Sequence, residues 1–346
     1  MGGILLLLGT AFFFSAASPL LASTEDEPVF LSPAAQASIE AIKRRAQELA
    51  ERKKAEEALY FYGELSQGVG YESNPSNLPA HSGSTFSESA AYLFLSKRIL
   101  PDLFWQGFYY GSLILYTNYN DGDYALQTLT PVRLLWRLPP TWRLEAGVHL
   151  EWLDYLDNKS VDYLQAEPFV GTRQNLCGNW YHLFQYGWFI RDYLSTRARS
   201  GQGQATLSSR QDTRHTFRHE IGTLWRDTLF QARQEWYLND SNDARRDFYD
   251  AQDYKVTALV SRPFLPKWTL NASFSFERKN YRKRRVGGIS AEARYDDIKT
   301  WIVSGRYGIN KTWSVVPTFS YRSLDSNEPT GEYVDVIHSI SVTARF

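Results

Sequence analysis

The sequence predicts an all-β fold, a transmembrane antiparallel up-and-down β-barrel of about 14 strands preceded by one N-terminal helix. Three observations predict it: apolar and polar residues alternate with a period of two, short and long connections alternate along the chain, and tryptophans lie near the ends of the predicted strands. The composition agrees, because 20 Phe, 22 Tyr and 11 Trp accompany a mean hydropathy of only −0.42. This mixture is typical of a wall between lipid and water.

Charge and cysteine content exclude several other classes of protein. The chain has 38 acidic and 38 basic residues, so it lacks the basic excess expected of a nucleic-acid binder. A single Cys excludes a disulfide framework and a Cys-based zinc site. Outside the first two dozen positions no apolar run reaches the ~20 residues of a membrane-spanning helix.

The N-terminal part is predicted to be a leader followed by a helix. Residues 1–22 have the apolar runs and small residues of a signal peptide. An uncleaved anchor is the alternative, because the start of this segment lacks a positive charge. Residues 23–58 are predicted to be a periplasmic helical segment, rich in Ala, Glu, Lys and Arg, with apolar residues at helical spacing. The helix 34–58 is expected either to dock a periplasmic partner or to enter the barrel.

Residues 59–346 are predicted to form the barrel itself. In the segment 142–152 every even position is apolar, and charged residues occupy most odd positions. The same alternation recurs in 268–276, 313–321 and 334–346. Strands of about eleven residues match the 9–11 of a tilted membrane strand and exceed the usual 5–6 of soluble sheets.

Six short turns alternate with seven longer polar connections, which predicts fourteen strands with both ends of the barrel sequence on the short-turn side. The short turns lie near Pro101, Pro139, Gly178, Asp227, Pro266 and Asn310. The longer connections lie near 73–87, 119–123, 156–160, 194–212, 239–250, 279–294 and 323–332. This arrangement is typical of barrels in the outer membrane of Gram-negative bacteria, with short periplasmic turns and long external loops.

The tryptophans predict two belts at the membrane boundaries, where indole rings are enriched. Those near short turns are Trp105, Trp136, Trp142, Trp180, Trp225, Trp268 and Trp313. Those near the opposite strand ends are Trp152, Trp188, Trp236 and Trp301. A soluble propeller is the alternative, but its strands would be shorter.

The last strand ends on Phe346 after alternating apolar and polar residues. It resembles the terminal signal that the insertion machinery of outer-membrane barrels recognises. Phe346 is therefore predicted to be the insertion signal, and the insertion machinery and outer-membrane lipid are the predicted partners.

The alternation places charges of both signs on the inner face. The predicted lumen-lining charges are Arg133, Arg137, Arg143, Glu145, His149, Glu151, Arg173, Arg214, Arg218, Glu220, Arg233 and Glu235. They are expected to form either a salt-bridged network that closes or stiffens the lumen, or a transverse field that selects polar or anionic cargo. A separate basic cluster, Arg282, Lys283, Arg284 and Arg285, is predicted to contact the phosphates of lipopolysaccharide.

No catalytic residues, metal site or cofactor are predicted, and the chain is expected not to be an enzyme. The sequence contains no Gly-x-Ser-x-Gly elbow, no His-Glu-x-x-His run and no phosphate loop. His215 and His219 share the lipid-facing side of one predicted strand, without a Ser or Asp on that side. His149 is expected to be one member of a polar network more readily than a metal or proton site.

The first predicted strand leads into Gly68-Val-Gly-Tyr-Glu-Ser-Asn-Pro-Ser-Asn77. This segment resembles the Gly-Tyr-Asp-Ser-Asn segment that opens the barrel of surface lipoprotein assembly modifiers. The sequence departs from that family because one helix, and no tetratricopeptide repeats, precedes the barrel. The resemblance implies a pore or translocation component that exports a protein or polymer to the cell surface. The residues by themselves also allow a passive porin for small polar or anionic solutes.

Overall fold

The computed structural model describes residues 59–76, 82–119, 122–138, 141–157, 162–176, 179–200, 204–243, 251–286, 292–328 and 331–346, without the side chain of Lys283. The predicted signal peptide, 1–22, and the predicted helical segment, 23–58, lie outside the described residues. Within the described part of the chain, no helix combines the length and the hydropathy needed to cross a membrane.

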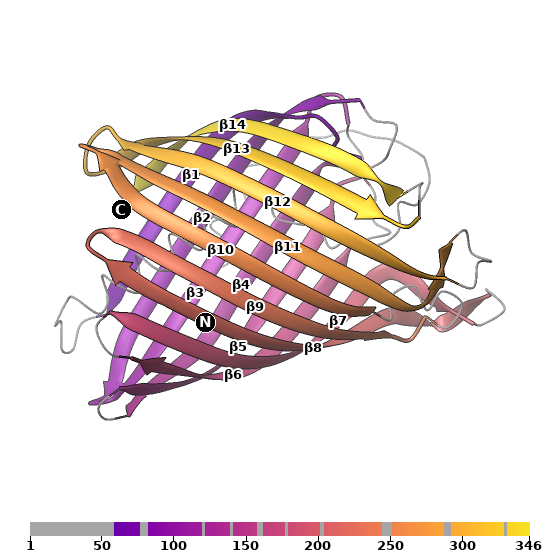
Figure 1. Cartoon of the computed structure of the whole chain (residues 1–346), viewed down its shortest axis with the longest axis horizontal. Helices are drawn as coiled ribbons and strands as arrows, with labels where there is room; N and C mark the ends of the chain where they lie inside the picture. Colours follow the sequence, from indigo (N-terminus) through magenta and orange to yellow (C-terminus); the bar gives the residue numbers. More distant parts are fainter. Residues whose placement is uncertain are drawn as a thin grey trace, which may run out of the picture.

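Fourteen antiparallel strands form one closed barrel, in which each strand pairs with its neighbours in the sequence and β14 pairs with β1 (Figure 1). The strands are β1 (Tyr60–Glu72), β2 (Ser84–Leu100), β3 (Leu103–Tyr116), β4 (Tyr124–Leu138), β5 (Trp142–Tyr155), β6 (Tyr163–Asn175), β7 (Trp180–Arg199), β8 (Ala205–Trp225), β9 (Thr228–Ser241), β10 (Ala251–Leu265), β11 (Trp268–Arg285), β12 (Ala293–Gly308), β13 (Trp313–Ser326) and β14 (Tyr333–Arg345). The predicted fourteen-stranded up-and-down barrel is confirmed.

Two of the predicted long connections are largely strand. The region 194–212 contains the end of β7 and the start of β8, and 279–294 contains the end of β11 and the start of β12. Both hairpins extend past their neighbours at the end of the barrel opposite the C-terminus (Figure 1). Polar side chains suggested loops there, but polar sequence does not prevent two strands from continuing their hydrogen-bond ladder into water.

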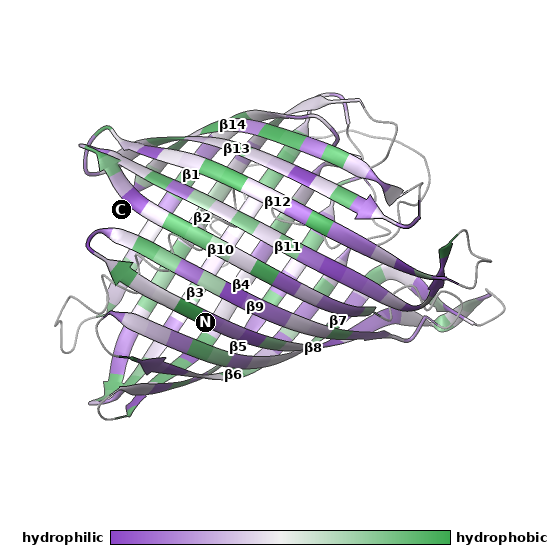
Figure 2. Cartoon of the chain, in the orientation of Figure 1, coloured by the Kyte–Doolittle hydropathy of each residue, from purple (hydrophilic) through white to green (hydrophobic). Residues whose placement is uncertain are grey.

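The outer face is apolar and the inner face is mostly polar. On β5, the outward Leu144 is 38% exposed, whereas its neighbour Glu145 is 5% exposed and lies inside the barrel. Apolar and polar bands follow one another along the strands, and the extensions of β11 and β12 are mostly hydrophilic (Figure 2). This pattern is that of a wall with lipid outside and polar groups inside.

The tryptophan side chains lie on the lipid-facing surface near both ends of the strands. Exposed examples near the short turns are Trp136, Trp142, Trp180, Trp225 and Trp313. Exposed examples toward the other end are Trp152, Trp188, Trp236 and Trp301. These two groups correspond to the predicted belts.

An irregularity in β4 decides which of its residues face the lumen. The pairing of β4 with β5 shifts between Leu129 and Val132, around Pro131. Proline has no N–H for the ladder and is found at such irregularities, and here the indole of Trp105 donates a hydrogen bond to the Pro131 carbonyl (3.2 Å). Before the shift, the even-numbered residues of β4 point inward. One extra residue reverses this alternation, so the odd-numbered Arg133 faces the lumen after the shift.

The seam between the first and last strands is tied at both ends. At the short-turn end, Gly63 and Phe346 exchange two backbone hydrogen bonds of 3.0 Å, and a Cβ on Gly63 would lie 2.4 Å from the Phe346 ring. At the other end, the Ser73 N–H donates to the Val336 carbonyl (2.9 Å) and the Asn74 N–H donates to Asp335 (3.0 Å). The segment noted for its family resemblance therefore closes the barrel.

Deleting Phe346 is expected to block assembly of the barrel. The deletion removes both backbone hydrogen bonds to Gly63 and the contact with the Phe61 ring, whose centroid lies 5.8 Å from that of Phe346. The measurement is the amount of outer-membrane protein that migrates faster in unboiled than in boiled gel samples. Phe346→Trp, which keeps an aromatic ring, should assemble at close to normal levels. Normal assembly of the deletion variant would show that the signal lies elsewhere.

Candidate functional site

The inner wall of the barrel is the candidate site, and its ion pairs run along the wall. They join nearby strands, chiefly β4 with β5, β8 with β9 and β10 with β11. The pairs are Arg133 with Glu145, Arg218 with Glu235 (2.7 Å), Arg233 with Glu220 (2.9 Å) and Lys255 with Glu277 (3.5 Å). Because each pair lies between neighbouring strands, these contacts stiffen the wall without crossing the lumen.

Other arginines of the same wall lie against aromatic rings. The guanidinium of Arg173 is 3.9 Å from the centroid of Tyr181, and that of Arg214 is 4.8 Å from the centroid of Phe189. Arg143 lies directly opposite Arg173 in the pairing of β5 with β6. Ring faces attract cations but carry no net charge, so these ring contacts add no negative charge beside the guanidinium groups. The wall from β5 to β8 therefore holds closely spaced positive groups.

His149 and Glu151 belong to a polar and aromatic network. The Nδ1 atom of His149 lies 2.6 Å from the Thr130 hydroxyl, and its ring stacks on Phe169 with centroids 4.4 Å apart. Glu151 accepts a hydrogen bond from the Tyr163 hydroxyl (2.6 Å). No group of three or more His, Cys, Asp or Glu side chains suited to a metal ion occurs among the described residues.

Arg137 occupies a different place from the other predicted lumen charges. It is the penultimate residue of β4, at the short-turn rim, and its side chain is exposed. Its guanidinium lies 4.3 Å from the centroid of the Phe104 ring. Arg137 can therefore influence the periplasmic mouth of the barrel more directly than its interior.

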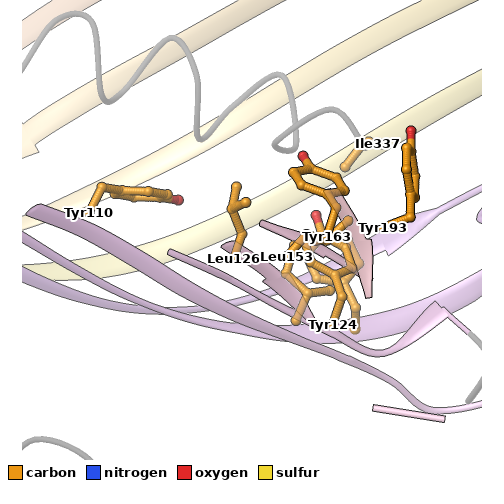
Figure 3. Close-up of a cluster of buried hydrophobic side chains, with 9 residues drawn as sticks. Tyr110, Tyr124, Leu126, Leu153, Tyr163, Tyr193 and Ile337 are labelled. Carbon is orange, nitrogen blue, oxygen red and sulfur yellow. The ribbon is translucent and has the colours of Figure 1, made fainter. Parts of the chain in front are cut away.

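An apolar cluster inside the barrel was not predicted. It contains Phe86, Tyr110, Ile114, Tyr124, Leu126, Leu153, Tyr163, Tyr193 and Ile337. Figure 3 shows the labelled members projecting from the strands into the interior. The alternation that located the charged residues also places these on the inner face. Because these side chains carry no charge, the pattern of inward ionisable residues does not reveal them.

The wall formed by β13, β14, β1 and β2 carries short side chains. Its inward residues include Ser66, Gly68, Ala90, Thr318, Ser339, Ser341 and Thr343, which together line a cavity. At its short-turn end, Glu64 is 3% exposed and receives hydrogen bonds from Arg306 (3.0 and 3.2 Å) and Arg345 (2.9 and 3.0 Å). The lumen therefore has an arginine-rich side and a side of small hydroxyl-bearing residues.

The predicted lipopolysaccharide residues lie at the far end of β11 and do not share one environment. Arg282 and Arg285 are exposed. Arg284 is half-buried, with its guanidinium 5.5 Å from the centroid of Tyr281. The side chain of Lys283 lies outside the description. Contact with lipopolysaccharide stays a prediction, and Arg282 and Arg285 are the residues placed to make it.

Comparison with solved structures shows similarity to outer-membrane barrels. OmpT of Vibrio cholerae is 11% identical with a TM-score of 0.50, over 85% of this chain and 99% of OmpT. The toluene transporter TodX of Pseudomonas putida is 11% identical with a TM-score of 0.45, over 82% of this chain and 89% of TodX. OccAB4 of Acinetobacter baumannii is 9% identical with a TM-score of 0.42, over 85% of this chain and all of OccAB4. No protein-family model matches the chain, and no curated protein matches it.

The fold and its lipid-facing surface confirm the predicted location in the outer membrane of a Gram-negative bacterium. The likeness to OmpT is one of fold alone, so the resemblance to surface lipoprotein assembly modifiers holds for the barrel and gains no support as a family assignment. The prediction that the chain is not an enzyme is wrong, because it excluded enzymatic function from the sequence alone. The barrel is similar to OmpT, and a shared barrel fold does not restrict a protein to passage of solutes.

Replacing Glu64 with Gln is expected to destabilise the barrel. The change leaves Arg306 and Arg345 without their shared carboxylate, and breaking a buried ion pair typically costs about 3 kcal/mol. The temperature at which the folded gel band is lost should fall. Glu332→Gln, which removes an exposed carboxylate before β14, serves as the control and should leave that temperature unchanged. Equal stability of all three proteins would contradict a structural role for Glu64.

Proposed function

We propose that the barrel is a channel for small polar solutes and that its lumen favours anions. The observation that carries this proposal is the direction of the lumenal ion pairs, which follow the wall between neighbouring strands. Pairs in this direction hold charged side chains against the wall. A solute in the lumen then meets fixed charges and hydroxyl groups, which is the arrangement used for selection in other pores.

The size of the barrel supports the same function. Fourteen strands spaced ~4.8 Å apart and tilted by ~40° make a backbone cylinder roughly 28 Å across. A cylinder of this width has room for inward side chains on both walls and for water between them. The short side chains of β14 and β1, including Ser339 and Ser341, leave the most room beside that wall.

The preference for anions follows from the arginine-rich side. Arg143, Arg173 and Arg214 lie on β5, β6 and β8, and aromatic rings lie beside Arg173 and Arg214. Their charge extends over a Debye length of ~8–10 Å in physiological salt, a distance comparable to the radius of the barrel. Anions should therefore be concentrated along this side.

Replacing Arg133, Arg143 and Arg218 with Gln is expected to shift ion selectivity toward cations by about twofold or more, because fixed positive charge in the lumen is removed. The measurement is the reversal potential in planar bilayers under a salt gradient. Arg278→Gln is the matched control, since Arg278 lies on the outer side of β11 and pairs with Asp297 (2.7 Å). Unchanged selectivity of a folded triple variant would leave these arginines as structural ties.

Export of a protein or polymer to the cell surface is the second candidate function, and it rests on the resemblance of the segment around Ser73. Deleting residues 34–56 behind an intact leader separates the two candidates. Under the export proposal, conductance stays unchanged and surface display of a co-encoded protein is lost. A gain in conductance would instead indicate that these residues block the channel. If neither property changes, export loses its support and the channel proposal remains.

A further inference from the structure

Glu88 differs from several carboxylates of the inner wall because it forms no ion pair with a described residue. It faces the lumen from β2, opposite Gly68 of β1. Glu145, Glu220 and Glu235 each pair with an arginine. Glu88 forms no ion pair and no hydrogen bond with any residue in the described part of the chain. Its carboxyl group is therefore available to a solute.

Glu88 borders a cavity of about 60 Å³ on the side of the lumen with short side chains. At roughly 15 Å³ for each water molecule, this volume holds about four water molecules or one small ammonium group with part of its hydration. Rings of Phe86, Tyr92 and Tyr110 line one side of it. Gly68 forms part of its floor, where a Cβ would lie only 3.0 Å from the Ser341 side chain. Because β1 and β14 pack closely at this point, a larger side chain at Gly68 would not fit without a shift.

Ser341 supplies the second polar group of the cavity. Gly68 lies opposite both Glu88 of β2 and Ser341 of β14, so these two side chains are level with each other on the inner wall. Gly68 has no side chain to fill the space between them. The carboxylate of Glu88 and the hydroxyl of Ser341 therefore border the same part of the cavity.

Arg306 is the one cation among the described residues that border the cavity, and it is already engaged. Arg306 donates two hydrogen bonds to Glu64 (3.0 and 3.2 Å). Glu64 lies four residues before Gly68 on β1, whereas Glu88 is level with Gly68. Four residues of strand span about 13 Å, so the ion pair is well separated from Glu88 along the wall. Glu88 is consequently not neutralised by Arg306.

We propose that this cavity is a binding site for the ammonium group of a small organic amine. The carboxylate of Glu88 supplies the counter-charge, the hydroxyls of Ser341 and its neighbour Ser339 accept N–H hydrogen bonds, and an aromatic face such as that of Phe86 attracts the cation. A single carboxylate is a poor match for a calcium ion, which takes six to eight oxygen ligands and usually several carboxylates. The inference rests on the proposed channel function for access, since amines would reach the site through the lumen. Glu88 lies on the wall of β13 to β2, away from the arginines of β5 to β8, so it forms a local cation site in a lumen whose arginine-rich side favours anions.

The experiment measures binding and conduction separately, with ethylammonium chloride as the probe. Equilibrium dialysis of the purified full-length protein in detergent with radiolabelled ethylammonium reports binding whether or not the barrel conducts. Planar bilayers then report whether ethylammonium reduces the potassium current. Folding of each variant is checked by the shift between unboiled and boiled gel samples.

Glu88→Gln should weaken ethylammonium binding at least tenfold, and Ser341→Ala should weaken it several-fold. Glu332→Gln, which removes a carboxylate outside the lumen, should bind like the unchanged protein. Equal binding by folded Glu88→Gln protein, or no saturable binding by the unchanged protein, would overturn the site. Binding without any conductance would support the site and overturn the channel proposal instead.

Discussion

Satisfaction of backbone hydrogen bonds inside the membrane is the constraint on which the rest of this structure depends. Lipid offers no partner to an N–H or C=O group, so a sheet can cross a bilayer only if it closes on itself. Closure requires β1 and β14 to find each other, although they are the most distant strands in the sequence. The bonds of Gly63 with Phe346, and of Ser73 and Asn74 with β14, meet this requirement at the two ends of the seam.

Closure also separates side chains into two environments. Successive residues of a strand point to opposite faces, so each strand supplies lipid contacts and lumenal groups in alternation. A shift of one residue exchanges the two sets, which gives the irregularity around Pro131 its importance. The lipid-facing residues are apolar because they contact the membrane, whereas the inward residues can differ from one side of the barrel to the other.

That freedom produces an asymmetric lumen. Strands β5 to β8 bring long arginine side chains inward, held by carboxylates of neighbouring strands or by rings such as Tyr181. Strands β13 to β2 bring in Ser, Thr, Gly and Ala, with Glu88 as a carboxylate unpaired among the described residues. Under the proposed channel function, the arginines on one side and the carboxyl group on the other create a transverse field across the lumen. Such a field orients a dipolar solute and distinguishes it from an apolar one.

The sequence by itself determined the barrel, the strand number, the lipid-facing tryptophans and the inward positions of residues such as Glu145 and Arg218. These features depend on local alternation and turn spacing, which pairing with neighbouring strands does not alter. Only the tertiary structure decided which charges are compensated. Glu235 of β9 pairs with Arg218 of the neighbouring strand β8, whereas Glu88 forms no ion pair among the described residues. It also decided that the arginines face a wall of small residues, since curvature brings together strands that are far apart in the chain. Which side chains pair, and which strands face each other across the lumen, depend on how the barrel closes. Alternation along one strand determines neither.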